Sequence, residues 1–207
     1  MRRTKNDRPR LAVFCSGHGT NLQALIHAAR RGRLRARIAL VVSDQPRAYA
    51  LTRARRYGIP TVVVPRAESP TRAAFERTIR YTLAAHRIRY IALAGFMRIL
   101  SPAFVRAYRG RILNIHPALL PAFPGAHAVR DTLRAGAKVT GVTVHVVDAG
   151  VDTGPIILQE TLPIRRGETE SALLQRIHRL EHRLYPQALH YLVTGRLRLR
   201  GRRVIMR

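Results

Sequence analysis

Short runs of apolar, mostly β-branched residues alternate along the chain with longer amphipathic stretches. Such runs predict strands, and the amphipathic stretches predict helices that bury one face. The expected strands are residues 11–15, 37–43, 61–64, 90–94, 111–115, 139–147 and 155–162, with two short edge strands at 196–199 and 203–206. The expected helices are residues 21–31, 48–57, 71–86, 128–135 and 168–193, with a short one starting at Ser101-Pro102. Strands alternating with helices predict an α/β fold, with a Rossmann-like, mostly parallel sheet flanked by helices.

Length and composition fit one folded domain. The chain has 207 residues, of which 46% are hydrophobic and 24% charged, as in ordinary globular proteins. We expect residues 1–10 to form a basic N-terminal arm and residues 11–207 a single domain. No apolar run approaches the roughly 18 residues of a membrane span, and none near the N-terminus suits a secretory signal. The single cysteine, Cys15, excludes an intramolecular disulfide and favours a cytoplasmic protein.

The positive charge is extreme. Lys and Arg number 38 against 11 Asp and Glu, which gives a formal net charge of +27. The arginines are scattered through the expected helices as well as clustered at 30–37 and 195–207, and aromatic residues make up only 6%. A dedicated nucleic-acid-binding protein usually concentrates charge on one face and adds aromatic residues for stacking. The pattern therefore favours solvated basic faces, with nonspecific binding of polyanions as the alternative.

A glycine-containing turn, Ser-Gly-His-Gly-Thr-Asn-Leu at residues 16–22, follows the first expected strand and opens the first helix. Glycines let the backbone turn tightly, and a helix N-terminus offers free N–H groups to a phosphate. The turn lacks the third glycine of a dinucleotide site and the Gly-Lys-Ser/Thr ending of a P-loop. A mononucleotide or sugar phosphate fits it better, and an ordinary tight turn is the alternative.

Asn114 and His116 stand at the carboxyl end of an expected strand, where open α/β sheets bind ligands. Strand alternation places both side chains on one side. A carboxamide donor beside an imidazole suits acyl transfer, because both can stabilise an oxygen that becomes negative. A hydrogen-bonded core pair is the alternative.

The turn-rich segment 148–155 allows two interpretations of Asp152. Its aspartates could bond their own backbone in a hairpin turn. Alternatively, Asp152 lies beside His116, raises the imidazole pKa above its usual value of about 6.5 and keeps the ring charged. The nine histidines are dispersed along the chain and Cys15 has no second cysteine beside it, so we expect no metal site.

Five motifs in this order resemble the phosphoribosylglycinamide formyltransferases, a folate-dependent family. They are Gly17-x-Gly19-Thr20-Asn21-Leu22, Ala94-Gly95-Phe96-Met97-Arg98-Ile99-Leu100, Asn114-x-His116-Pro117-x-Leu119-Leu120-Pro121, Thr140-Gly141-x-Thr143-Val144-His145 and Asp152-x-Gly154-Pro155-Ile156-Ile157-x-Gln159. The resemblance implies the formyltransferase fold. It also implies transfer of a formyl group from 10-formyltetrahydrofolate to the amine of 5-phosphoribosylglycinamide in purine biosynthesis.

The resemblance further implies residue roles. Asn114 and protonated His116 would stabilise the oxygen of a tetrahedral intermediate, and Asp152 would assist by holding the charge and moving a proton. The ribonucleotide would contact Gly19, Thr20, Asn21, His178, Arg179, Leu180 and Glu181. The folate would contact Arg72, Met97, Arg98, Ile99, Leu100, Asn114, Asp148, Ala149, Gly150, Val151 and Asp152.

Three alternatives remain at this point. The resemblance extends to methionyl-tRNA formyltransferase and formyltetrahydrofolate deformylase, which share the trio of Asn, His and Asp. Each of them carries a further domain, so a length of 207 residues disfavours both. The third is a noncatalytic polyanion-binding protein on the same scaffold. Its RNA binding would be sensitive to salt and would survive His116→Ala.

Overall fold

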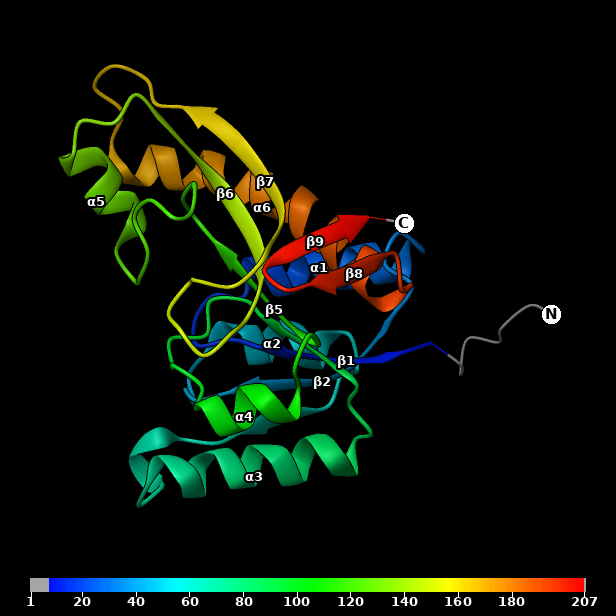
Figure 1. The fold of residues 1–207 in the computed structure, drawn as a ribbon. Coiled ribbons are helices and arrows are strands. Elements are labelled where there is room, and N and C mark those ends of the chain that lie inside the picture. The colour runs from blue at the N-terminus through cyan, green and yellow to red at the C-terminus, as the bar shows by residue number, and fades with distance from the viewer. Residues whose placement is uncertain (1–7, 207) are drawn as a thin grey trace.

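The computed structural model describes residues 8–206, and the strands between Arg10 and Pro163 form a seven-stranded sheet (Figure 1). Its strands lie in the order β3-β2-β1-β4-β5-β6-β7. Neighbours from β3 to β5 pair in parallel, whereas β6 pairs antiparallel with both β5 and β7. The strands are β1 (Arg10–Phe14), β2 (Arg37–Ser43), β3 (Thr61–Val63), β4 (Tyr90–Leu93), β5 (Ile112–His116), β6 (Val139–Val146) and β7 (Ile156–Pro163). The mostly parallel α/β sheet predicted from the sequence is thereby confirmed.

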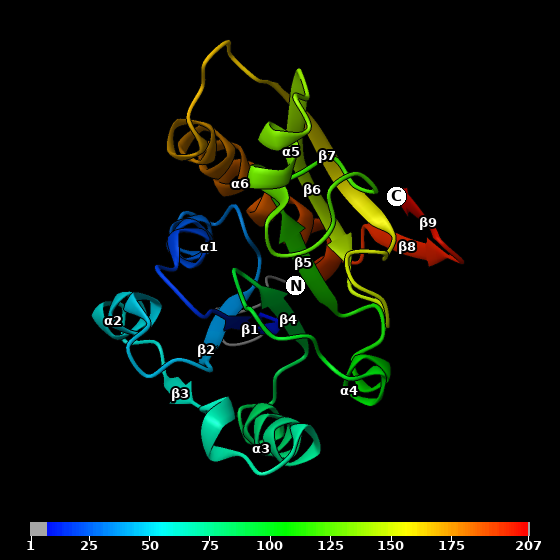
Figure 2. The same ribbon diagram turned by 90° about the vertical axis from the view of Figure 1, so that its left-hand side faces the viewer.

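Helices cover both faces of this sheet (Figure 2). They are α1 (Thr20–Arg30), α2 (Tyr49–Arg56), α3 (Arg72–Ala85), α4 (Pro102–Ala107), α5 (Ala128–Arg134) and α6 (Glu170–Val193). Strand β1 shows why the sequence forms two cores: Leu11 and Val13 pack in the cluster with α1, α2 and α6, whereas Ala12 and Phe14 pack in the cluster with α3 and α4. A strand buried on both faces reads as a continuous apolar run.

Side-chain caps fix where several helices begin. The hydroxyls of Thr71, Ser101 and Thr169 accept hydrogen bonds from backbone N–H groups in the first turns of α3, α4 and α6. Such caps satisfy N–H groups that have no partner inside the helix. The caps therefore also fix the ends of the loops that precede these helices.

The expected strands and helices are all present, with ends shifted by at most two residues. A short 3₁₀ helix, Arg66–Glu68, was not expected, and His116 ends β5 rather than starting the following loop. The tail forms an antiparallel hairpin of β8 (Leu197–Arg200) and β9 (Arg203–Met206). Of the predicted N-terminal arm, residues 1–7 lie outside the described residues, and Arg10 is the first residue of β1. No helix in residues 8–206 has the length and apolar character to cross a membrane.

Candidate active site

The polar residues singled out in the sequence gather at the carboxyl ends of the parallel strands. The turn at 16–22 follows β1 and the segment 97–100 follows β4. Asn114 and His116 lie within the last three residues of β5. In open α/β sheets this edge is where ligands bind. Because β6 runs antiparallel beside β5, the loop 148–155 leaves β6 near Ile112, at the start of β5, and turns back so that Asp152 reaches Asn114 and His116.

The loop carries Asp152 to the two polar residues of β5. One carboxylate oxygen accepts a hydrogen bond of 3.2 Å from the Asn114 amide, and the other lies 3.3 Å from His116 Nδ1. The Gly125 N–H donates to that second oxygen at 2.9 Å. Asp152 has a φ of 54°, a left-handed conformation that few residues other than glycine adopt. The structure thus brings together the three residues expected to be catalytic.

The imidazole of His116 does not have the raised pKa expected from the sequence. Burial lowers its pKa below the ordinary 6.5, and a nearby His145 acts in the same direction. The carbonyl of Phe123, 2.8 Å from Nε2, and the charge of Asp152 both favour the protonated ring, but burial outweighs them. The expectation was wrong because the ring is only 3% exposed, which the sequence did not reveal.

The carboxyl group of Asp152 stays ionised although it is largely buried. Burial alone would raise its pKa, but the hydrogen bond with His145, the Gly125 N–H and the proximity of His116 lower it to about 2. The site therefore holds one carboxylate that is negative throughout the neutral range.

The two interpretations of the loop 148–155 each apply to a different aspartate. The Asp148 carboxylate accepts hydrogen bonds from the Gly150 N–H at 3.1 Å and from the Thr153 hydroxyl at 2.6 Å, so it closes the turn on itself. Asp152 instead faces the end of β5. Asp148 thus shapes the loop that presents Asp152.

The turn after β1 has the backbone of an anion site. Gly19 lies at φ 71°, and a Cβ there would come within 2.7 Å of the Ala50 side chain, so glycine is required on both counts. Thr20 and Asn21 open α1, whose first N–H groups have no partner within the helix. The guanidinium of Arg53 donates to the carbonyl of His18 at 2.9 Å and adds a positive charge that sequence reasoning missed.

Of the α6 segment 178–181, Glu181 and His178 fit a site beside this turn best. The Asn21 amide donates to the Glu181 carboxyl group at 2.8 Å, and burial raises the pKa of Glu181 to about 7. The His178 ring is half-buried, and burial lowers its pKa. Arg179 is exposed and the Leu180 side chain packs in the core, so neither shares the position of Glu181.

The segment 97–100 presents apolar side chains to solvent. Met97 is 63% and Ile99 66% exposed, whereas Leu100 is buried in the second core cluster. The Arg72 guanidinium donates to the Ile99 carbonyl at 2.8 Å, which fixes the backbone from the side of α3. Val151, in the loop 148–155, is also exposed, and Ala149 and Gly150 lie beside it.

Sequence reasoning missed a fourth polar group, His145 of β6. Its Nε2 lies 3.2 Å from the Asn114 amide nitrogen and 3.5 Å from the Asp152 carboxylate. The sequence showed that Thr143 and His145 alternate along one strand and share a side. It is the pairing of Asn114 with His145 across β5 and β6 that brings His145 into the site. Across residues 8–206, no group of three or more His, Cys, Asp or Glu is arranged to hold a metal ion.

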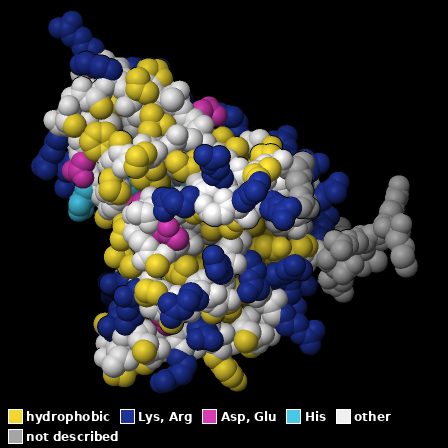
Figure 3. Space-filling model, viewed as in Figure 1, with side chains coloured by type: hydrophobic (Ala, Val, Ile, Leu, Met, Phe, Trp, Pro, Cys, Tyr) yellow, Lys and Arg dark blue, Asp and Glu magenta, His cyan; other side chains and the backbone are white. Residues whose placement is uncertain are grey.

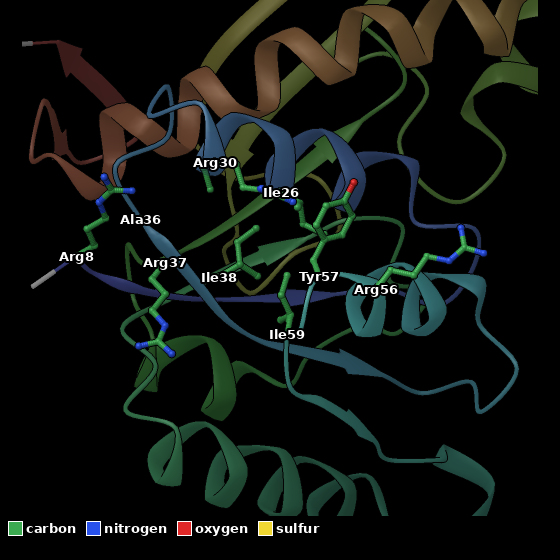
Figure 4. Close-up of a pocket in the computed structure, with 10 residues that line it drawn as sticks. Arg8, Ile26, Arg30, Ala36, Arg37, Ile38, Arg56, Tyr57 and Ile59 are labelled. Atoms are coloured by element: carbon green, nitrogen blue, oxygen red, sulfur yellow. The ribbon is translucent and has the colours of Figure 1, made fainter. Parts of the chain in front are cut away.

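Basic side chains are spread over the surface, as Figure 3 shows for one face. A hollow of about 810 Å³ lies at the amino ends of the strands, opposite the site. Ile26, Ile38, Ile59 and Tyr57 lie near its centre, with arginines around them (Figure 4). Its remaining lining residues are Arg8, Ala29, Arg30, Ala36, Arg37 and Arg56. The Arg30 guanidinium stacks over the Tyr57 ring and that of Arg56 over Tyr49, so these cations do not converge on one point.

A Rossmann-like sheet with Asn, His and Asp at its carboxyl edge defines an α/β protein with the groups needed for acyl-group transfer. The model of the formyl transferase family matches residues 9–189. The chain therefore belongs to the formyl transferase family.

Similar proteins share most of this chain. The phosphoribosylglycinamide formyltransferase of Bacillus subtilis is 44% identical over 184 residues, which cover 89% of this chain and 94% of that protein. The trifunctional purine biosynthetic protein adenosine-3 of Drosophila pseudoobscura pseudoobscura is 47% identical over 96% of this chain, which spans only 15% of that protein. The crystal structure of glycinamide ribonucleotide transformylase 1 from Symbiobacterium toebii has a TM-score of 0.94 at 47% identity, covering 96% of this chain and 94% of that one.

Proposed function

We propose that the protein transfers a formyl group from 10-formyltetrahydrofolate to the amine of 5-phosphoribosylglycinamide, a step of purine biosynthesis. The observation that carries the proposal is the contact of Asp152 with both Asn114 and His116 at the carboxyl edge of the sheet. The names of the relatives from Bacillus subtilis and Symbiobacterium toebii support this substrate pair.

The acceptor ribonucleotide is assigned to the turn after β1 and the facing part of α6. The phosphate is bound by the backbone around Gly19, Thr20 and Asn21, because these N–H groups and the helix dipole favour an anion. Glu181, held by Asn21, is placed to accept hydrogen bonds from the sugar hydroxyls.

The folate is assigned to the surface between the segment 97–100 and the loop 148–155. The exposed side chains of Met97, Ile99 and Val151 suit a flat, largely apolar ring system. Arg72 supplies a positive charge at the end of this surface, where it suits the carboxylates of the folate glutamate.

The polar groups at the end of β5 then act on the transfer itself. The bound folate supplies the formyl group. As the amine attacks the formyl carbon, the Asn114 amide stabilises the oxygen that becomes negative. His116, neutral in the free protein because burial lowers its pKa, accepts the proton that the amine releases. The resulting imidazolium lies beside the ionised Asp152, which stabilises it until the proton passes to the departing folate nitrogen.

The direct test follows tetrahydrofolate formation from 10-formyltetrahydrofolate, with and without the ribonucleotide. We expect production that requires the ribonucleotide and that falls strongly in His116→Ala. His86→Ala, at the end of α3, is the matched control and should keep the wild-type rate. Production without the ribonucleotide would indicate the deformylase, and no production in either mixture would refute the proposal.

We further propose that the protein works in the cytoplasm and that its basic surface adds a weak, salt-dependent attraction to polyanions. Support for the first comes from Cys15, the lone cysteine, which is buried. Support for the second comes from the net charge of +27 and the arginine-lined hollow. Retention on heparin that persists above roughly 1 M salt would contradict a merely nonspecific attraction, because salt at that concentration screens charges beyond about 3 Å.

A further inference from the structure

Two buried carboxylates fix the backbone of the segment 97–100, and neither belongs to the catalytic group. The first is Asp44, which follows β2 and is 3% exposed. One of its oxygens accepts a hydrogen bond of 2.6 Å from the Ser16 hydroxyl, and the other accepts one of 2.7 Å from Arg98 Nε. The Ser16 hydroxyl in turn accepts a hydrogen bond of 2.9 Å from the Met97 N–H. The start of the segment is thereby tied to β1 and β2.

The second carboxylate, Glu76 of α3, fixes the other end. It accepts hydrogen bonds from the Ser101 N–H at 2.6 Å and from the Ser101 hydroxyl, and it pairs with Arg72 at 3.3 Å. Arg72 also donates to the Ile99 carbonyl at 2.8 Å. Bonds to charged groups are stronger than bonds between neutral ones, so both ends of the segment are firmly held.

The held backbone explains how large apolar side chains can stand in solvent in a defined position. Met97 and Ile99 are exposed, while Asp44 and Glu76, the carboxylates that anchor the groups bonded to their backbone, are buried. A ligand that packs against a segment already in place does not have to order it, and this lowers the cost of binding. The arrangement is that of a preorganised binding surface.

We propose that Ser16 and Asp44 are positioning residues that hold the segment 97–100 in the conformation that binds the formyl donor. The role of the segment rests on the proposed function. Ser16 directly precedes the phosphate-binding turn, and its own N–H donates to the Gly95 carbonyl at 2.9 Å. Ser16 thus links the segment 97–100, which binds the formyl donor, to the turn that binds the phosphate of the acceptor.

The decisive variants are Ser16→Ala and Asp44→Asn. The first removes the acceptor of the Met97 N–H, and the second keeps an oxygen for Ser16 but loses the ion pair with Arg98. Hydrogen exchange of the free protein should speed up by about 10-fold at Met97 in both, because a charge-assisted network is broken. The KM for 10-formyltetrahydrofolate should rise by about 10-fold, while the KM for the ribonucleotide changes less than about twofold.

Matched controls separate positioning from a general loss of stability. Ser69→Ala removes a hydroxyl whose bond to the Pro65 carbonyl is long, 3.4 Å, and Asp131→Asn neutralises a half-buried aspartate of α5. Both should leave exchange in the segment and both KM values unchanged. Ser16→Thr keeps the hydroxyl and should restore the donor KM.

The two readouts also distinguish failure of this inference from failure of the proposed function. If the wild-type protein transfers no formyl group, the function is wrong, whereas exchange at Met97 still tests whether Ser16 and Asp44 hold the segment. Wild-type exchange in both variants would overturn the inference. So would faster exchange with an unchanged donor KM in an active enzyme, because the held conformation would then not matter for binding.

Discussion

Replacing Glu181 by Gln should make the protein more stable at alkaline pH, even though the wild-type side chain makes a good hydrogen bond. Glu181 is 5% exposed, and burial raises its pKa from 4.5 to about 7. Gln has nearly the same size, and its carbonyl oxygen can accept the bond from Asn21. The substitution therefore removes the cost of burying a charge and keeps the packing.

The size of the effect follows from the two pKa values. Between 4.5 and about 7 the folded protein keeps a proton that the unfolded chain has lost, so its stability falls as the pH rises. The proton on Glu181 therefore stabilises the folded protein fully below pH 4.5, and this stabilisation is lost by about pH 7. Over that interval the free energy of unfolding falls by about 3 kcal/mol. Glu181→Gln has no such loss. Its advantage over the wild type should grow from less than about 1 kcal/mol at pH 5 to about 3 kcal/mol at pH 8.

Urea unfolding of both proteins at pH 5, 6.5 and 8 measures this advantage directly. Titration of all other groups cancels in the difference between the two proteins. Glu170→Gln, an exposed position at the start of the same helix, measures the effect of removing one negative charge from a chain of net charge +27. A difference for Glu181→Gln that is flat with pH, or that favours the wild type at pH 8, would refute the reasoning.

Three further predictions concern the proposed catalytic group and its loop. Asp152→Asn should lower the rate of formyl transfer by about 10²- to 10³-fold in a steady-state assay, and a wild-type rate would exclude its role. Because burial lowers the pKa of His116 and we propose the neutral ring as the proton acceptor, kcat/KM should fall only as the pH drops below 6.5; a midpoint above 6.5 would contradict this. Gly154→Ala would place a Cβ 1.7 Å from the carbonyl oxygen of Val146 and should destabilise the protein by more than about 2 kcal/mol in urea unfolding, whereas an unchanged midpoint would show that the loop can move aside.

The fold could be predicted from the sequence largely because its central strands are buried on both faces. The run 11–15 is apolar at every position, and the structure divides its side chains between two cores. Patterns of this kind locate strands but do not say which strands are neighbours. The antiparallel placement of β6 between β5 and β7 depends on long-range packing, so no local pattern contained it.

The sequence predicted those parts of the site whose side chains come from one strand. Alternation along β5 places Asn114 and His116 on one side, and both contact Asp152. His145 and the Gly125 N–H reach the same carboxylate only through the pairing of β5 with β6 and the path of the loop after β5. When two groups come from different elements, their spacing in the sequence does not show that they lie close together in the fold.

The charges of the site were the least predictable feature, because each depends on a balance between burial and local donors. Burial lowers the pKa of His116 and raises the pKa of Glu181, and both shifts favour the neutral side chain. Asp152 is largely buried as well, yet it stays ionised because the hydrogen bond with His145, the Gly125 N–H and the proximity of His116 lower its pKa. Sequence reasoning counted the opposite charges of Asp152 and His116 and therefore expected an imidazolium. The structure instead gives one fixed negative charge beside a neutral imidazole, which is the arrangement that can take up a proton during the reaction rather than one that has already done so.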